Sequence, residues 1–200
     1  MNRIIFFIVK NKDDPDHIFN IQNKNSLLSS DEKKFYFNSK YTGIEEIDVN
    51  FENIIFDETL YHNLELVLEI AKEEAKKLSE EPLGKEIIPG SLKGVLYSAV
   101  MNAYYNPPNS IFDFVTILFI KIATEHKLYN GNKRVALLFL IGSLRLFGYH
   151  FYFSKGFKKD YEKYETKLEN IVKKYQNGYN KYDEEIKWVQ ENSVIALEWR

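Results

Sequence analysis

Two long apolar segments, separated by a short polar one, constrain the fold of this chain more than any other feature. Residues 111–123 and 135–147 are apolar on nearly every helical face, and helices of that kind lie buried inside a bundle. Ser110 and Asp113 form a capping box that starts the first of them. The sequence therefore predicts a mainly α fold in which two central buried helices are joined by the polar loop 126–134.

Further helices are predicted on both sides of this central pair. Apolar residues recur at helical spacing over residues 60–78 and 92–103, which is typical of amphipathic helices that pack on a core. Residues 158–175 and 183–191 also have a helical pattern. The segment 158–175 is rich in Lys, Glu and Tyr, so we expect an exposed helix there.

The N-terminal part of the chain has a different pattern. Residues 3–10 are rich in β-branched and aromatic side chains, which favours a strand, and we expect residues 17–21 to return as a second one. Residues 34–37 and 48–51 alternate weakly between apolar and polar side chains, whereas residues 23–30 are polar and predict a loop. These segments indicate a small β-rich appendage.

The domain organisation follows from length and from the lack of dividers. A chain of 200 residues is long enough for one compact domain with an appendage. No internal repeat or low-complexity linker divides it. We therefore predict a β-rich region in residues 1–59 packed on the core, a helical core in residues 60–155, and a C-terminal helical extension in residues 156–200.

Composition excludes several classes of function. The net charge of −2 and the absence of a basic stripe argue against nucleic-acid binding. The chain has no cysteine, which excludes disulfides, thiolate metal sites and a cysteine nucleophile, and fits a reducing, cytoplasmic setting. The apolar run 135–153 is interrupted by Ser143, Arg145 and His150, which favours a buried helix over a membrane span.

The polar loop between the central helices has the composition of a phosphate-binding turn. Gly131 permits left-handed backbone conformations, and Asn130 and Asn132 tolerate them. Successive amides of such a turn form an anion-binding nest, and the turn opens a helix whose free N–H groups favour anions. Lys133 and Arg134 stand in the first helical turn, where they oppose the helix dipole. A bound anion would explain these two cations.

His126 lies across the loop from this predicted anion site and is our candidate general base. An imidazole accepts protons near neutral pH, so the pair of features suits transfer of a phosphoryl or nucleotidyl group to a hydroxyl. Each feature also has a simpler explanation. A histidine often caps a helix, an Asn-Gly pair often only forms a turn, and a Lys-Arg pair is often solvated.

The order of residues in the loop adds a family resemblance. The stretch His126-x-Leu128-x-Asn130-Gly131-Asn132-Lys133-Arg134 resembles the signature of the Fic/Doc (Fido) family, H-x-F-x-[D/E/N]-[G/A]-N-[G/K]-R. Lys after the second Asn is the form of the Doc branch. The resemblance covers residues 60–155. It implies a Fido-type helical bundle, with a flap hairpin expected at residues 82–94.

The resemblance also implies a role for individual residues. His126 would deprotonate the target hydroxyl, and Asn130 would hold Mg²⁺. Gly131, Asn132 and Lys133 would form an anion hole, and Lys133 and Arg134 would contact the nucleotide phosphates. In the expected flap, Ile87 and Ile88 would dock a segment of the target protein as an added strand.

The activity implied by the resemblance is that of a Doc-like transferase. It would move a phosphoryl group from ATP or another nucleoside triphosphate to a Ser, Thr or Tyr hydroxyl of a target protein, with Mg²⁺ as cofactor. The Doc branch further implies a toxin of a toxin–antitoxin pair, with a translation factor as candidate target and an antitoxin as candidate partner.

Three departures from the family pattern bear on this expectation. Leu128 replaces the usual Phe, which is an apolar exchange at a packing position. Asn130 in place of an acid keeps an oxygen ligand but removes its charge. Leu137 stands where Fic-type AMP transferases carry a second Arg, which disfavours AMP transfer (AMPylation).

Two alternatives to a phosphotransferase therefore stay open. One is a Fic-type AMP transferase, and the other is a catalytically weakened Fido-fold protein that binds a nucleotide or partner. The nearest match to the family's inhibitory helix pattern, Lys187-x-x-x-Glu191-Asn192, lacks the Ser or Thr, so control by a separate partner is expected.

Overall fold

The chain is mainly helical in the part that the structure describes. A computed structural model describes residues 3–8, 27–31, 34–39, 43–151 and 157–195. The helices are α2 (Glu58–Lys77), α3 (Ser91–Tyr105), α4 (Ile111–Thr124), α5 (Asn132–Leu146), α6 (Phe157–Gln176) and α7 (Asp183–Glu191). The strands are β1 (Arg3–Ile8), β2 (Leu27–Asp31), β3 (Lys34–Ser39), β4 (Gly43–Asn53), β5 (Tyr149–Phe151) and β6 (Ser193–Ile195). The predicted mainly α fold is confirmed.

Helices α4 and α5 lie at the centre of the helical part, as the sequence predicts. Ten of the 14 residues of α4 and nine of the 15 residues of α5 are buried. The start of α4 is fixed by Ser110, whose hydroxyl accepts a hydrogen bond of 3.1 Å from the Asp113 amide. Burying a large apolar side chain stabilises a fold by about 1.5–3 kcal/mol, so this pair dominates the core.

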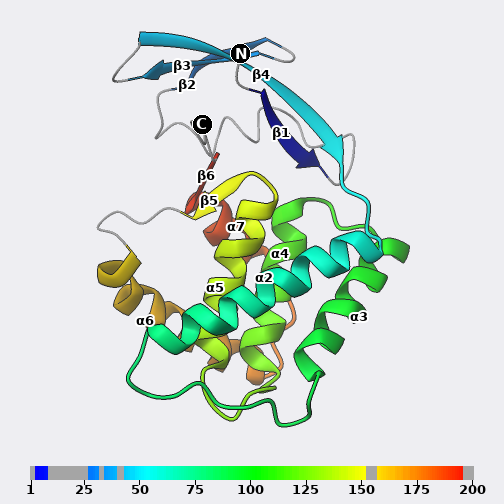
Figure 1. Ribbon diagram of the computed structural model, residues 1–200, viewed down its shortest axis with the longest axis vertical. Helices are drawn as coiled ribbons and strands as arrows, with labels where there is room; N and C mark the ends of the chain where they lie inside the picture. The colour runs from blue at the N-terminus through cyan, green and yellow to red at the C-terminus, as the bar shows by residue number, and fades with distance from the viewer. Residues whose placement is uncertain (1–2, 9–26, 32–33, 40–42, 152–156, 196–200) are drawn as a thin grey trace.

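The other helices cover this pair from different sides. Helix α2 crosses α5 (Figure 1) and buries Leu60, Leu64, Leu68, Ala71 and Ala75. Gly142 of α5 allows the close crossing, because a Cβ there would lie 2.7 Å from Cγ1 of Val67. Helix α3 packs on α2 and α4, while α6 and α7 pack on α4. The first turn of α5, directly after the loop, contacts α2 through Arg134 and α6 through Lys133.

The N-terminal strands form a four-stranded sheet in the order β1-β4-β3-β2 (Figure 1). Strand β1 pairs in parallel with β4, so the sheet is more than a series of hairpins. The predicted strands at 3–10, 34–37 and 48–51 are confirmed in part. The predicted loop at 23–30 is wrong at its end, where Leu27–Asp31 pairs with β3. The predicted strand at 17–21 lies outside the described residues.

The C-terminal extension packs on the core through β6 and through aromatic contacts. Strand β6 pairs antiparallel with β5, directly after α5. Trp188 of α7 lies 5.4 Å from Phe151 of β5 and 6.3 Å from Phe119 of α4, measured between ring centroids. Such contacts fix the position of α7 against α4. How residues 1–59 pack on the core stays a prediction, because the side chains of residues 1–53 are not described.

The expected flap hairpin does not form. Residues 84–87 are a single extended piece, and residues from Ser91 onward belong to α3. Pro89 and Gly90, the latter with φ of +79°, turn the chain into that helix, so no second strand follows. The extended piece pairs instead with the polar loop, through an antiparallel bridge between Glu86 and Leu128.

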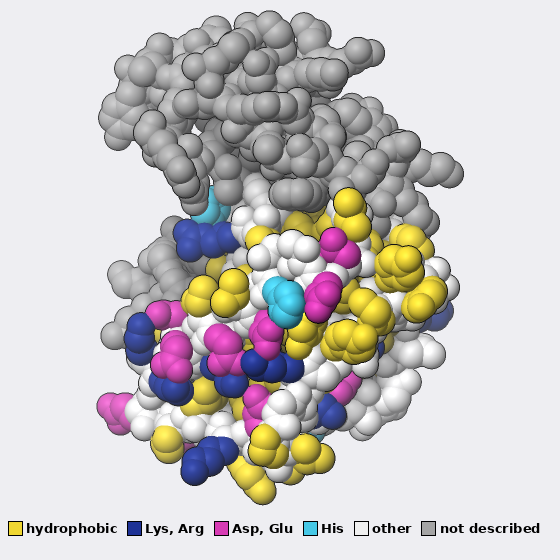
Figure 2. All heavy atoms as spheres, turned by 45° about the vertical axis from the view of Figure 1, so that its right-hand side comes forward, with side chains coloured by type: hydrophobic (Ala, Val, Ile, Leu, Met, Phe, Trp, Pro, Cys, Tyr) yellow, Lys and Arg dark blue, Asp and Glu magenta, His cyan; other side chains and the backbone are white. Residues whose placement is uncertain are grey.

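Two further observations concern the distribution of surface charge and the hydropathy of the helices. Acidic and basic side chains are interspersed on the face that Figure 2 shows, and no basic patch gathers among its described side chains. None of the helices in the described part of the chain has the length and hydropathy needed to cross a membrane.

Candidate functional site

The polar loop between α4 and α5 is held in shape by the side chain of Asn132. This side chain is buried, and its Oδ1 accepts a hydrogen bond of 2.9 Å from the Leu128 amide. Its Nδ2 donates to the Leu128 carbonyl oxygen at 2.7 Å. Leu128, in the place of the family's Phe, is itself buried. The Asn132 carboxamide is therefore occupied within the loop, and only its backbone N–H is placed to meet an anion.

Gly131 turns the loop into α5. Its φ is +90°, in the left-handed region, and a Cβ at this position would lie 2.4 Å from Cδ1 of Leu83. The first bond within α5 runs from the Val135 amide to the Gly131 carbonyl oxygen. The amides of residues 132–134 thus precede the helical ladder, as at any helix N-terminus. This is the arrangement that the predicted anion site requires.

Arg134 connects the loop to the end of α2. Its side chain is only 7% exposed. Its NH1 donates to the Glu81 carbonyl oxygen at 2.9 Å and to the Ala75 carbonyl oxygen at 3.4 Å. The Nε and NH2 atoms lie beside Gly131, within 3.6 Å of the place where a Cβ would stand. One edge of the guanidinium therefore supports the fold, and contact of the other edge with phosphate stays a prediction.

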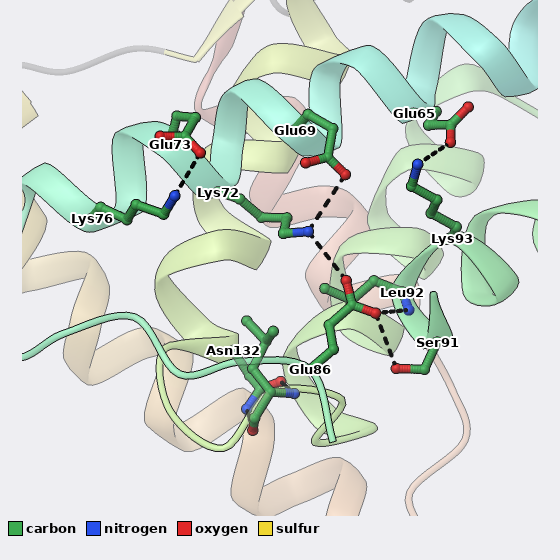
Figure 3. Close-up of polar contacts among 11 residues, drawn as sticks. Glu65, Glu69, Lys72, Glu73, Lys76, Glu86, Ser91, Leu92, Lys93 and Asn132 are labelled. Atoms are coloured by element: carbon green, nitrogen blue, oxygen red, sulfur yellow. Dashed lines mark hydrogen bonds and ion pairs between the residues drawn. The ribbon is translucent and has the colours of Figure 1, made fainter. Parts of the chain in front are cut away.

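The extended piece 84–87 runs beside the polar loop, outside the cleft lining, and is anchored by Glu86 (Figure 3). The Glu86 carboxylate accepts hydrogen bonds from Lys72 of α2 at 3.1 Å and from the Leu92 amide at 3.4 Å. It thereby caps α3, whose own N-cap residue Gly90 offers no side chain. Burial raises the pKa of Glu86, but these hydrogen bonds outweigh it and lower the pKa below its ordinary value.

The predicted docking residues lie at the end of this piece. Ile87 and Ile88 are 47% and 67% exposed. The Ile87 amide donates to the Lys127 carbonyl oxygen, and the Tyr129 amide donates to the Lys85 carbonyl oxygen. The N–H and C=O of Glu86 point to the opposite side, because neighbouring residues of an extended chain alternate in direction. Docking of a target segment along that edge stays a prediction.

One cleft brings together the predicted site residues of the loop, but not Ile87 and Ile88. It has a volume of about 660 Å³, within the range typical of ligand sites. His126 and the whole stretch Asn130 to Arg134 line it. On the other side it is lined by side chains of α6, namely Tyr161, Glu165, Glu169, Lys173 and Gln176.

Helix α6 is the part of the site that the sequence reasoning missed. Four of its lining residues follow each other at intervals of four, at positions 161, 165, 169 and 173, and residues so spaced share one helical face. That spacing was the available signal. It was hidden because a Lys- and Glu-rich helix also resembles a fully solvated one.

Helix α6 contacts two of the predicted site residues directly. Lys133 Nζ lies 3.0 Å from Oε1 of Glu169, and this hydrogen bond lowers the pKa of Glu169. The side-chain amide of Gln176 contacts Nε2 of His126. His126 is exposed and has a φ of +48°, a left-handed conformation that ends α4. Burial raises the pKa of Tyr161, nearer the start of α6.

A buried carboxylate on α7 holds the end of α6 in place. Glu185 is 1% exposed, accepts a 2.6 Å hydrogen bond from the Tyr175 hydroxyl, and lies 3.1 Å from Lys174 Nζ. Burial, together with the bond to Glu185, raises the pKa of Tyr175 far above its usual range. Tyr175 also stacks on Tyr182 at 5.3 Å. These contacts fix the residue next to Gln176.

Asn130, the predicted Mg²⁺ ligand, lies beside other oxygen atoms. Asn130 Nδ2 donates to Glu81 Oε2 at 3.3 Å and to the Pro82 carbonyl oxygen at 3.4 Å, so a carboxylate and a backbone carbonyl oxygen lie beside the Asn130 side chain. Among the described residues no group of three or more His, Cys, Asp or Glu could hold a metal. Mg²⁺ that accompanies phosphates needs only one or two protein oxygens, so this donor set suits it.

Comparison with known proteins does not extend the resemblance. No protein-family model matches the chain, and searches of curated proteins and of solved structures found no match. The fold and site define a mainly helical protein with a cleft suited to an anionic ligand at a helix N-terminus. The Fic/Doc resemblance therefore stays a prediction that rests on residues 126–134.

Proposed function

We propose that this protein is a Doc-like transferase of the Fic/Doc type, which moves a phosphoryl group from ATP or another nucleoside triphosphate to a Ser, Thr or Tyr hydroxyl of a target protein. One observation carries the proposal. A single cleft is lined by His126, by the N-terminus of α5 and by Lys133. A proton acceptor and an anion site in one cleft are what transfer of a phosphoryl group to a hydroxyl needs.

The chemical step is a displacement at the γ-phosphorus. The oxygen of the target hydroxyl forms a bond to phosphorus as its proton passes to the imidazole of His126. The bond between phosphorus and the bridging oxygen breaks, and the nucleoside diphosphate leaves. Amides at the start of α5 and Lys133 neutralise charge on the phosphates. Catalysis of this kind depends on positioning and electrostatics, because little covalent chemistry falls to the protein.

Mg²⁺ would be held by the Asn130 side chain and would supply further charge neutralisation at the phosphates. The target segment would add to the edge of residues 84–87, with Ile87 and Ile88 as its apolar contacts. Strand addition gives affinity through main-chain hydrogen bonds, so it tolerates many target sequences. The proposal includes a translation factor as target and an antitoxin as partner. Both are inferred only from Lys133, the residue that marks the Doc branch.

Phosphoryl transfer is favoured over AMP transfer by the position of Leu137. Its side chain is fully buried in α5 and is not among the residues that line the cleft. The second arginine of AMP transferases thus has no counterpart at this position. Lys133 and Arg134 are the cations of the loop that line the cleft.

A second candidate function is nucleotide or partner binding without turnover. Two contacts favour it, because α6 engages both His126 and Lys133 in this structure. Asn130, which is uncharged, is the further feature in its favour. In this case the protein binds ATP but transfers nothing, and Asn130→Asp creates activity that the natural chain lacks.

The experiment that tests the proposal compares two labels of ATP. The purified protein is incubated with a bacterial extract and with ATP labelled at either the γ- or the α-phosphorus. We expect protein-bound label from γ-labelled ATP only, and none with His126→Ala. His62→Ala is the matched control, because His62 is an exposed histidine on α2 away from the cleft, and it should label like the natural protein.

The outcomes separate the candidates. Labelling from α-labelled ATP identifies an AMP transferase. Equal labelling by the natural chain and by His126→Ala contradicts the enzyme. Nucleotide binding without any labelling identifies the binding protein.

A further inference from the structure

The carboxylate that the loop lacks at Asn130 is present next to it in space. Glu81 belongs to the segment after α2, and its Oε2 accepts the 3.3 Å hydrogen bond from Asn130 Nδ2. Both residues line the cleft. Rotation of a carboxamide by 180° exchanges its nitrogen and its oxygen. Here it breaks the bonds that Nδ2 donates to Glu81 and to the Pro82 carbonyl oxygen, and a cation that enters between these oxygens would replace them. Asn130 Oδ1 and the Glu81 carboxylate can therefore face one point together.

The position of Glu81 is set by the loop itself. Arg134 NH1 donates to the Glu81 carbonyl oxygen, and the Gly84 amide donates to the Asn130 carbonyl oxygen at 3.0 Å. A Cβ on Gly84 would lie 2.3 Å from the Asn130 amide nitrogen, so the two segments touch. The Glu81 side chain is exposed to the cleft, while its backbone is tied to a buried guanidinium. The carboxylate is thus presented by a fixed peptide.

The charged side chains of the cleft are too evenly balanced to neutralise a bound nucleoside triphosphate by themselves. Three carboxylates and three basic side chains line it, namely Glu81, Glu165 and Glu169 with Lys133, Arg134 and Lys173. Two of these bases are already engaged, Lys133 by Glu169 and Arg134 by backbone carbonyls. A nucleoside triphosphate is a polyanion, and this balanced set does not neutralise it. A divalent cation between its phosphates and Glu81 would.

We propose that Glu81 supplies, with Asn130 Oδ1, the protein ligands of a divalent cation that enters with the nucleotide. The inference rests on the proposed function, since the phosphates provide the remaining oxygens. Mg²⁺ is the expected ion, because it accepts one carboxylate, one amide oxygen, water and phosphate oxygens in an octahedral set. The acid that other loops of this type carry within the motif is thereby supplied from outside it.

The test measures metal binding directly. Mn²⁺ replaces Mg²⁺ as a paramagnetic probe, and its binding is followed by electron paramagnetic resonance with and without a non-hydrolysable ATP analogue. We expect the analogue to strengthen Mn²⁺ binding to the full chain. Glu81→Gln should weaken binding at least tenfold, which is about 1.4 kcal/mol. Glu80→Gln is the matched control, because Glu80 is an exposed neighbour outside the cleft lining, and it should change nothing.

The outcomes separate this inference from the proposed function. Mn²⁺ affinity unchanged by Glu81→Gln, with the analogue still bound, overturns the metal site alone. Failure of the natural chain to bind the analogue overturns the proposed function and the metal site with it. The double variant Glu81→Gln with Asn130→Asp should recover Mn²⁺ binding, since it restores one carboxylate at the same point. Recovery also shows that Glu81→Gln had kept its fold.

Discussion

The two walls of the cleft are built in different ways. The wall formed by Glu81 and residues 129–134 is fixed by hydrogen bonds between backbone groups and buried side chains, above all those of Asn132 and Arg134. The wall formed by α6 meets the loop through long, exposed side chains, as in the pair of Lys133 and Glu169. Buried hydrogen bonds fix a geometry, whereas exposed ion pairs contribute little and exchange readily.

This difference assigns different tasks to the two walls. The first wall presents the helix N-terminus, Gly131 and Glu81 in one arrangement, as an anion site needs. The second wall can give up its contacts when a ligand enters, because their loss is nearly balanced by hydration. Substitutions of the buried groups that hold the first wall together should therefore change stability, and substitutions in the second wall should change binding.

The largest effect is expected from Asn132→Ala, which breaks the first wall at its centre. Removal of the carboxamide leaves the amide and carbonyl of Leu128 without their partners in a buried place, which costs about 2–4 kcal/mol. Urea unfolding measures this. Asn102→Ala is the control, because Asn102 is exposed on α3, and it should change stability by less than about 0.5 kcal/mol. Equal effects of the two changes would contradict the role of the Asn132 side chain in holding the loop in shape.

A smaller loss is expected from Gly131→Ala. The new methyl group meets Leu83, and the backbone must keep a φ of +90°, which together cost about 1–3 kcal/mol. Gly94→Ala is a control for which we expect the opposite change, a gain in stability. Gly94 lies within α3, where an added methyl group would meet no atom within 4 Å, so alanine there should stabilise the protein by about 0.5–1 kcal/mol. An equal loss of stability at both positions would show that the left-handed conformation of Gly131 does not cause the effect.

The helices and the loop could be predicted because local signals determine them. The apolar content of α4 and α5 requires burial, and Ser110 and Gly131 have turn chemistry that depends on their immediate neighbours. The loop's predicted residues accordingly line one cleft. What the sequence could not show is the partner of each residue across space.

Three contacts could not be predicted for that reason. The Asn132 side chain bonds to the backbone of Leu128, while its predicted part in an anion hole stays a prediction. Arg134 NH1 donates to the carbonyl oxygens of Ala75 and Glu81, while its predicted contact with nucleotide phosphates stays a prediction. The expected flap is a single extended piece because the loop itself is its partner. Periodicity reports which face of an element is buried, and not which element covers it.

Glu86→Gln tests how firmly the extended piece 84–87 is attached to α2 and α3. The change weakens the bonds from Lys72 and from the Leu92 amide (Figure 3), and should lower stability by about 1 kcal/mol at neutral pH. The folded-state pKa of Glu86 is below its ordinary value of 4.5. Its contribution is therefore full above that value and is lost as the pH falls through the folded-state pKa.

The measurement is urea unfolding of the natural chain and of Glu86→Gln from pH 7 into the acidic range. The difference in stability should be constant near neutrality and should shrink in acid. Glu80→Gln, an exposed neighbour, should follow the natural chain at every pH. A difference that persists unchanged in acid would show that Glu86 acts by shape and not by charge.

The smallest effect on stability, and the sharpest contrast between the walls, is expected from Glu169→Gln. The pair with Lys133 is exposed, so its loss should leave urea unfolding unchanged. Nucleotide binding should instead become severalfold tighter. Lys133 then has no ion pair to break before it contacts a phosphate, and the cleft holds one negative charge fewer to repel the nucleotide. A fluorescent ATP analogue measures this by anisotropy. Glu73→Gln on α2, which breaks an exposed pair with Lys76 outside the cleft, should alter neither property. Weaker binding by Glu169→Gln would mean that α6 supports the ligand and does not compete with it.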